Sequence, residues 1–175
     1  MNIKFYIEKL ENSGIYKKFI KENPDAFLCS GFFVIDKQGS DNKQHLDFFV
    51  PGKNSTNGKT FSFQIDKEIN LVPIEERDNI ENNKNLFPKP KKLDFNYDFD
   101  FNEIEEIIQK KMEENKIKNT IQKYLFSLQK VENRDYLIGT VFISMLGLIK
   151  VNISLPEKKV MIFEKRSIFE IVKKG

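Results

Sequence analysis

Side chains that readily act as nucleophiles or bases are scarce in this chain, which has one cysteine, Cys29, and one histidine, His45. A cysteine nucleophile needs a neighbouring base, most often a histidine, to hold it as the thiolate. Cys29 lies in the apolar run 26–35, where a small buried hydrophobic residue fits, and His45 follows Lys43 and Gln44 near the start of another predicted strand. We therefore predict that Cys29 is buried and chemically inert and that no intrachain disulfide forms.

The acidic segment 94–105 has the oxygen spacing of a calcium loop but lacks its turn. Its oxygen-bearing side chains fall at positions 1, 3, 5, 7, 9 and 12 of an EF-hand, whereas Phe99 occupies the position that requires glycine. The alternation of Phe95, Tyr97, Phe99 and Phe101 instead predicts an extended segment with one apolar face. One cysteine and one histidine also cannot form a structural zinc site without carboxylates. We expect neither a metal site nor a cofactor.

The common catalytic and nucleotide-binding motifs do not occur in the sequence. It contains no P-loop, no Rossmann glycine fingerprint, no G-x-S-x-G elbow and no H-E-x-x-H. Two carboxylates could still meet in the folded chain, because spacing along the sequence does not reveal such a pair. A carboxylate-dependent enzyme therefore stays open as an alternative function.

Nucleic-acid binding is a second alternative. The net charge is +3, and residues 119–175 carry ten basic and five acidic side chains, a balance that could attract nucleic acid or an acidic partner. Lysines also alternate with phenylalanine and tyrosine in the predicted strands, as in some nucleic-acid-binding sheets. No segment has the aromatic RNP pattern of those folds, so we expect these aromatic residues to serve the core.

The elements that would position any site follow the same order twice, a helical segment and then short alternating strands. In the first copy, helical spacing over residues 2–22 is interrupted at Ser13 and Gly14, which predicts two helical pieces or one kinked helix. Three strands are expected after it, and the dipeptide at residues 57–58, Asn-Gly, is the strongest hairpin signal in the chain. The expected strands of this copy centre on residues 27–35, 46–50 and 61–65.

The second copy begins with the helix that we predict most firmly, residues 102–116, with Asn102 as its N-cap. Four strands should follow, over residues 124–128, 136–144, 148–155 and 160–164, with turns at 131–135 and 156–159. Ser167 and Glu170 have the spacing of a capping box, which predicts a short terminal helix.

We predict an α+β fold made of two helix-on-antiparallel-sheet halves, residues 1–66 and 102–175, joined by a connector over residues 67–101. The connector is rich in proline, asparagine and charge, and Leu93 is among the apolar residues expected to pin it to the core. Hydrophobic residues make up 39% of the chain, enough for a sizeable core, and no apolar run reaches 18 residues. A cytoplasmic location is our expectation.

A helix followed by an antiparallel meander, occurring twice, resembles a tandem cystatin-like or PepSY-like arrangement. Residues 142–160 are similar to the strand, turn and strand that end PepSY modules, although the turn at 155–160 lacks the aspartate, threonine and glycine of that family. Residues 46–51 fit the same outline more loosely. PepSY-like domains are associated with binding or inhibiting peptidases, so the resemblance implies a binding role rather than catalysis.

The stretch from Gln129 to Asn133 is similar to the Q-x-V-x-G loop with which cystatins enter the cleft of papain-like proteases. Gln129 and Val131 match that pattern, and Asn133 replaces its glycine, a position where asparagine tolerates a positive φ better than most residues. Lys130 and Glu132 would have to point sideways or lose their hydration at the contact, and the chain has no Trp for the cystatin partner loop. An ordinary polar hairpin is the alternative interpretation.

Together these patterns favour an uncharacterised non-enzymatic binding or interaction protein. The partner we expect is a protein or a peptide, not nucleic acid and not a membrane. Gln129, Val131 and Asn133 are the candidate contact residues, with peptidase regulation as the sharpest version of the role.

Overall fold

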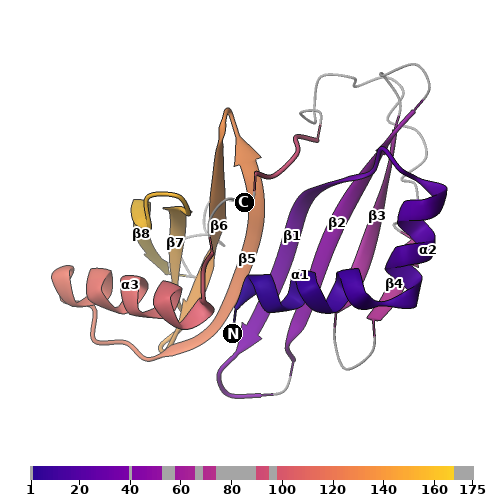
Figure 1. Ribbon diagram of the computed structural model, residues 1–175. Coiled ribbons are helices and arrows are strands. Elements are labelled where there is room, and N and C mark those ends of the chain that lie inside the picture. Colours follow the sequence, from indigo (N-terminus) through magenta and orange to yellow (C-terminus); the bar gives the residue numbers. More distant parts are fainter. Residues whose placement is uncertain are drawn as a thin grey trace, which may run out of the picture.

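The computed structural model describes residues 2–39, 41–52, 58–65, 69–73, 90–94 and 98–167, and of residues 69–73 only the backbone. This part of the chain forms three helices and one antiparallel sheet of eight strands in the order β4-β3-β2-β1-β5-β6-β7-β8 (Figure 1). The α+β class is therefore confirmed. The strands span β1 Phe27–Asp36, β2 Lys43–Pro51, β3 Gly58–Ile65, β4 Ile69–Pro73, β5 Ile121–Val131, β6 Arg134–Ile143, β7 Gly147–Ser154 and β8 Lys159–Ser167.

The N-terminal helical segment is two helices, α1 Ile3–Asn12 and α2 Gly14–Glu22. Ser13 separates them because its backbone is extended, with φ −73° and ψ 144°. Its side chain accepts a hydrogen bond from the N–H of Tyr16 and so caps α2. The predicted interruption at Ser13 and Gly14 is thus confirmed.

The helix α3 covers Phe101–Glu114 and starts one residue earlier than expected. Asp100, not Asn102, is its N-cap, and the Asp100 carboxylate accepts a hydrogen bond from the N–H of Asn102 at 2.7 Å. Both residue types cap helices well, and the extended backbone of Asp100 decides between them. The predicted apolar stripe is present, because Ile104, Ile108 and Met112 are all buried.

One expectation about the strands needs correction. Residues 69–73, placed in the connector from the sequence, form β4 and pair with β3. The predicted hairpin is present, because β2 and β3 pair in antiparallel fashion with Pro51 opposite Gly58, the first residue of β3. The terminal helix expected after Ser167 lies outside the described residues.

The sheet is continuous across β1 and β5, which pair in antiparallel fashion with Phe33 opposite Phe126. In Figure 1, α1 and α2 lie over the strands β1 to β4, and α3 lies over the other end of the same sheet. Phe101 of α3 contacts Phe33 with ring centroids 4.9 Å apart, so this helix packs at the junction. Gly139 on β6 pairs with Phe126, and a Cβ at this position would meet the Leu125 carbonyl oxygen and the Phe126 ring.

Buried apolar residues of all three helices and of strands on both sides of the junction form a single core cluster. A second aromatic group lies under α2, where Phe19 packs edge-on against Phe48, Phe61 and Phe63. None of the helices in the described part of the chain is long and apolar enough to cross a bilayer. The strands of the two copies are joined in one sheet. That the copies are two related helix-on-sheet halves stays a prediction.

Candidate functional site

The hairpin between β5 and β6 carries the three residues singled out from the sequence. Gln129 and Val131 are the last outward-facing residues of β5, and Asn133 lies in the turn before Arg134, which pairs with Val131. All three candidate side chains are exposed, and 44% of Val131 is accessible. The structure therefore brings the candidate residues together at one projecting tip.

The turn of this hairpin differs from expectation in its backbone. Glu132 adopts the left-handed conformation with φ 54°, whereas Asn133 does not have a positive φ. The residue that takes the special conformation is thus the one before the glycine position of the cystatin-like pattern. A non-glycine residue in this region is strained, so Glu132 is held there by the hairpin around it.

Lys130 points away from the tip, as a contact surface there requires. Its Nζ lies 2.7 Å from Asp94 Oδ1 and 3.8 Å from Asp135 Oδ1, and only 10% of its side chain is exposed. The N–H of Asp94 donates to Asp135 Oδ2 at 2.9 Å, so the three residues form one cluster. The lysine charge is neutralised beside the hairpin and does not occupy its tip.

Residues 90–94 anchor the hairpin to the first part of the sheet. The Nζ of Lys91 donates to the carbonyl oxygen of Glu132 at 2.9 Å. The N–H of Leu93 donates to the carbonyl oxygen of Leu28 on β1 at 3.0 Å, and the Leu93 side chain is buried, as the sequence predicted. The tip is therefore held from the side by a segment far from it in sequence.

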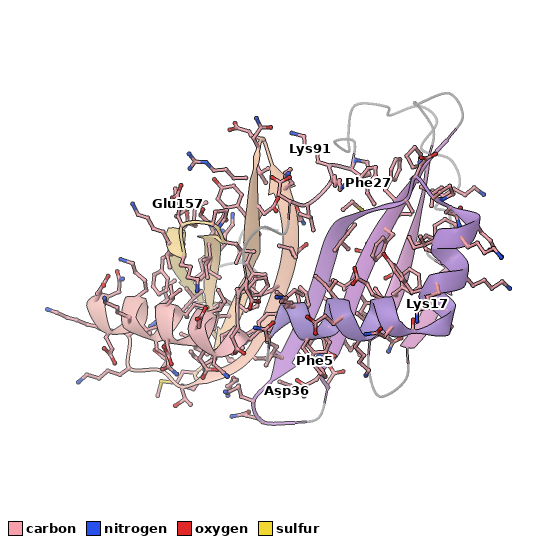
Figure 2. All side chains as sticks on the ribbon, in the orientation of Figure 1. Phe5, Lys17, Phe27, Asp36, Lys91 and Glu157 are labelled. Atoms are coloured by element: carbon pink, nitrogen blue, oxygen red, sulfur yellow. The ribbon has the colours of Figure 1, made fainter. Side chains whose placement is uncertain are left out.

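A second turn lies beside the first, between β7 and β8. The Arg134 guanidinium pairs with Glu157 Oε1 at 2.8 Å, and the N–H of Leu155 donates to the carbonyl oxygen of Asp135 at 3.1 Å. In this second turn Pro156 is exposed. Figure 2 shows Glu157 and Lys91 toward the same end of the molecule. We call the two turns, residues 131–134 and 155–158, the hairpin edge.

The pairing of the two turns was missed from the sequence, although a signal for it exists. In an antiparallel meander, alternate turns lie at the same end of the sheet. The turns after β5 and after β7 must therefore be neighbours once the strands β5 to β8 are consecutive. The chain has no tryptophan for the partner loop that cystatins use. A proline-containing turn nevertheless lies next to the first tip.

His45 belongs to a cross-strand hydrogen-bond network. Its Nδ1 lies 3.3 Å from Ser62 Oγ, and Ser62 donates to Asp47 Oδ1 at 2.7 Å. Ser30 donates to the other carboxylate oxygen of Asp47, also at 2.7 Å. Ser30, Asp47 and Ser62 are directly opposite one another on β1, β2 and β3, so only the register reveals the network.

The network has the residue types of a serine hydrolase but not its arrangement. In such enzymes histidine takes the serine proton and the carboxylate orients the histidine, whereas here Ser62 sits between His45 and Asp47. Acyl transfer also needs free backbone N–H groups to hold an oxyanion, and these residues lie in paired strands that use theirs in the sheet. We interpret the network as a polar clamp across three strands.

Cys29 lies next to this network and is buried, which confirms that part of the prediction. Its Sγ donates to the carbonyl oxygen of Asp47 at 3.3 Å. Burial raises the pKa of the thiol from 9.0 to about 11, so the thiolate is strongly disfavoured at neutral pH. The arrangement gives Cys29 no activating base.

A cavity of about 370 Å³ runs along α3, and a smaller one of about 70 Å³ adjoins it across the ion pair of Lys37 and Glu105. Burial and the neighbouring Glu105 carboxylate raise the pKa of the Tyr124 hydroxyl in the smaller cavity. This hydroxyl makes no well-formed hydrogen bond to a described residue. The larger cavity is lined by apolar residues, among them Met112 and Ile117, and by charged residues of both signs. Its volume would suit water or a small polar molecule.

The described residues contain no group of three or more histidine, cysteine, aspartate or glutamate side chains placed to hold a metal ion. Two acids of the calcium-like segment have other roles. Asp100 caps α3, and Asp98 accepts a hydrogen bond from the Asn2 side chain at 3.0 Å. Residues 95–97 of that segment lie outside the described part of the chain.

Comparison with known proteins shows no family for this chain. No family model matches the chain, and no curated protein matches it. Among solved structures, the chain is similar to the crystal structure of a "putative lipoprotein" from Clostridium difficile 630. The two share 14% sequence identity with a TM-score of 0.49, and the match covers 87% of this chain and 90% of the other.

Proposed function

We propose that this protein is a non-enzymatic binding module and that the hairpin edge is its contact surface. The observation that carries the proposal is the exposed Val131 side chain at the tip of a hairpin that is anchored on two sides. Surface recognition is the simplest function for such a feature, because an apolar side chain at a tip gains free energy when a partner covers it.

The anchoring of the two turns favours tight binding. Arg134 and Glu157 link the turns, and Lys91 and Lys130 hold the first turn from the side. A loop that is already ordered loses little conformational entropy when it binds, so more of the contact free energy appears as affinity. Lys130 adds no charge that a partner would have to desolvate, which removes one objection raised by the sequence.

The partner class we propose is a protein or peptide, and the sharpest version is a papain-like protease. The support is the match of Gln129 and Val131 to the cystatin wedge pattern and the neighbouring turn that contains Pro156. We also propose that the two halves are related to tandem cystatin-like or PepSY-like modules. A cytoplasmic location stays a prediction.

The test is inhibition of papain by the purified protein, with Val131→Asp as the decisive variant. We expect inhibition at micromolar protein and a loss of at least tenfold in the variant, because a carboxylate would replace the apolar side chain at the tip. Ile15→Asp is the matched control, since Ile15 is 42% exposed at the start of α2 and far from the hairpin edge in sequence.

Two results would contradict the protease version of the proposal. One is the absence of inhibition at micromolar concentration, and the other is inhibition that Val131→Asp leaves unchanged. The two alternative functions predict different behaviour: a carboxylate-dependent enzyme would turn over a substrate, and a nucleic-acid-binding protein would shift a polynucleotide in a salt-dependent way.

A further inference from the structure

The turn between β6 and β7 presents two apolar side chains to solvent at the end of the sheet opposite the hairpin edge. Met145 is 91% exposed and Leu146 is 53% exposed, which makes Met145 the most exposed large hydrophobic residue described. The turn after β5 and the turn after β6 lie at the two ends of β6, so this pair points away from the hairpin edge. Neither side chain belongs to the core cluster of the described residues.

Both residues are also unfavourable choices for their backbone conformation. Met145 has φ 61° and Leu146 has φ 54°, so two consecutive residues with side chains lie in the left-handed region. Hairpin turns with two positive φ angles strongly prefer Asn-Gly or a similar pair. A sequence that breaks a local rule without an internal gain points to a functional or strained site.

The backbone of this turn is held by hydrogen bonds from the residues that come just before β5. The N–H of Ser144 donates to the carbonyl oxygen of Thr120 at 2.8 Å, and the N–H of Thr120 donates to Ser144 Oγ at 3.1 Å. The side-chain amide of Asn119 donates to the carbonyl oxygen of Ser144 at 2.8 Å. The two apolar side chains therefore project from a rigid base.

Three exposed lysines of the described chain lie close to this base in sequence or by hydrogen bonding. Lys116 and Lys118 are exposed just before Asn119, and the exposed Lys165 donates to Asn119 Oδ1 at 3.1 Å. Within the described chain, none of these three lysines forms an ion pair with a carboxylate, whereas the nearby Arg166 is paired with Glu164. Glu113 of α3 shares the cavity beside Lys118, so the local excess is modest but positive.

We propose that this turn and its lysines contact the surface of a membrane that contains anionic lipids, although the sequence alone led us to expect no membrane partner. Exposed apolar side chains ringed by lysines are the combination that binds such interfaces, because the apolar groups enter the headgroup region and the lysines attract anionic lipids. No membrane-crossing segment is needed for a surface contact. In this orientation the hairpin edge points away from the bilayer and stays open to a partner.

The test is co-sedimentation of the purified protein with two kinds of vesicle. One kind is phosphatidylcholine alone, and in the other about a third of the lipid is phosphatidylglycerol. We expect binding to the anionic vesicles that falls as salt is raised. The double variant Met145→Asn with Leu146→Gly should bind at least tenfold more weakly. Because Asn-Gly suits this backbone, the variant should melt no lower than the parent, so lost binding cannot result from unfolding.

Two further variants complete the design. Lys118→Gln with Lys165→Gln should weaken binding to the anionic vesicles by about fivefold for each lysine. Met161→Asn is the matched control for the apolar residues, because Met161 is 47% exposed on the edge strand β8, and it should bind as the parent does.

Equal affinity for both vesicle types would overturn the proposal, as would undiminished binding by the Met145→Asn, Leu146→Gly variant. Failure of the parent protein to bind the anionic vesicles would also overturn it. If the parent then self-associates and this variant does not, the occupant of the turn is a second copy of the chain.

Discussion

At the scale of single residues, surroundings decide what a reactive side chain can do, and Cys29 is the clearest case. It is the one thiol in the chain, yet it lies in β1 among apolar residues with its Sγ directed to a backbone carbonyl. His45 is on the neighbouring strand but interacts with Ser62. A thiol and an imidazole on neighbouring strands therefore do not by themselves make a nucleophile and its base.

Cys29 should react slowly with small thiol reagents and should do so with a steep pH dependence. With a pKa of about 11 instead of 9.0, its thiolate fraction at pH 8 is lower by about a hundredfold. Labelling with iodoacetamide should be at least that much slower in the native protein than in denaturant and should speed up about tenfold per pH unit between pH 8 and 10.

The same pKa shift has a consequence for stability. The unfolded chain releases the Cys29 proton at a lower pH than the native protein does. The contribution of this shift to the free energy of unfolding is therefore fully present below about pH 9 and is lost as the pH rises toward 11. Rapid and stoichiometric labelling of the native protein at pH 8 would show that Cys29 is not in the position described.

At the scale of elements, the cluster of Lys130, Asp94 and Asp135 joins the β5–β6 hairpin to the chain that leads into α3. Asp135 is almost fully buried, and a buried carboxylate needs a compensating charge or hydrogen bonds. Lys130 and the N–H of Asp94 supply both. The cluster thus stabilises the hairpin that the proposed function uses.

Lys130→Met should lower the free energy of unfolding by about 2 kcal/mol, because it keeps the apolar stem of the side chain and removes the charge beside Asp135. Lys158→Met is the matched control. Its ion pair with Glu103 is half-exposed on both sides and should be worth less than about 0.5 kcal/mol. Urea unfolding of both variants measures the difference, and equal losses would show that the cluster is not stabilising.

At the scale of the whole molecule, the contact between β1 and β5 makes one sheet from strands that lie about ninety residues apart in the chain. Phe33 is fully buried at this junction, opposite Phe126 and against Phe101. A single core that crosses the junction should make the described sheet unfold as one cooperative unit.

Phe33→Ala should lower the free energy of unfolding by about 3–5 kcal/mol. Hydrogen exchange of the β3 and β7 amides should accelerate by the factor that corresponds to this loss. Phe32→Ala is the control, because Phe32 is the next residue on β1 but is 41% exposed on the other face, so its loss should cost less than about 1 kcal/mol. Acceleration confined to β3 would show that the two ends of the sheet unfold separately.

Local chemistry allowed much of the secondary structure to be predicted from the sequence. The break at Ser13, the apolar stripe of α3 and the strand alternation from β5 to β8 depend on residues within a few positions of one another. The exposed tip carrying Gln129, Val131 and Asn133 also followed from local turn signals, because a short segment between two alternating strands must turn.

Tertiary structure alone decided the rest. The pairing of β4 with β3, the junction of β1 with β5 and the network of His45, Ser62 and Asp47 all depend on which strands are neighbours and in what register. Register is set by the burial of one whole face of the sheet, a property of many distant residues together. For the same reason the sequence did not show that Lys130 would turn toward Asp94, or that two apolar residues would stand in a strained, exposed turn at the far end of β6.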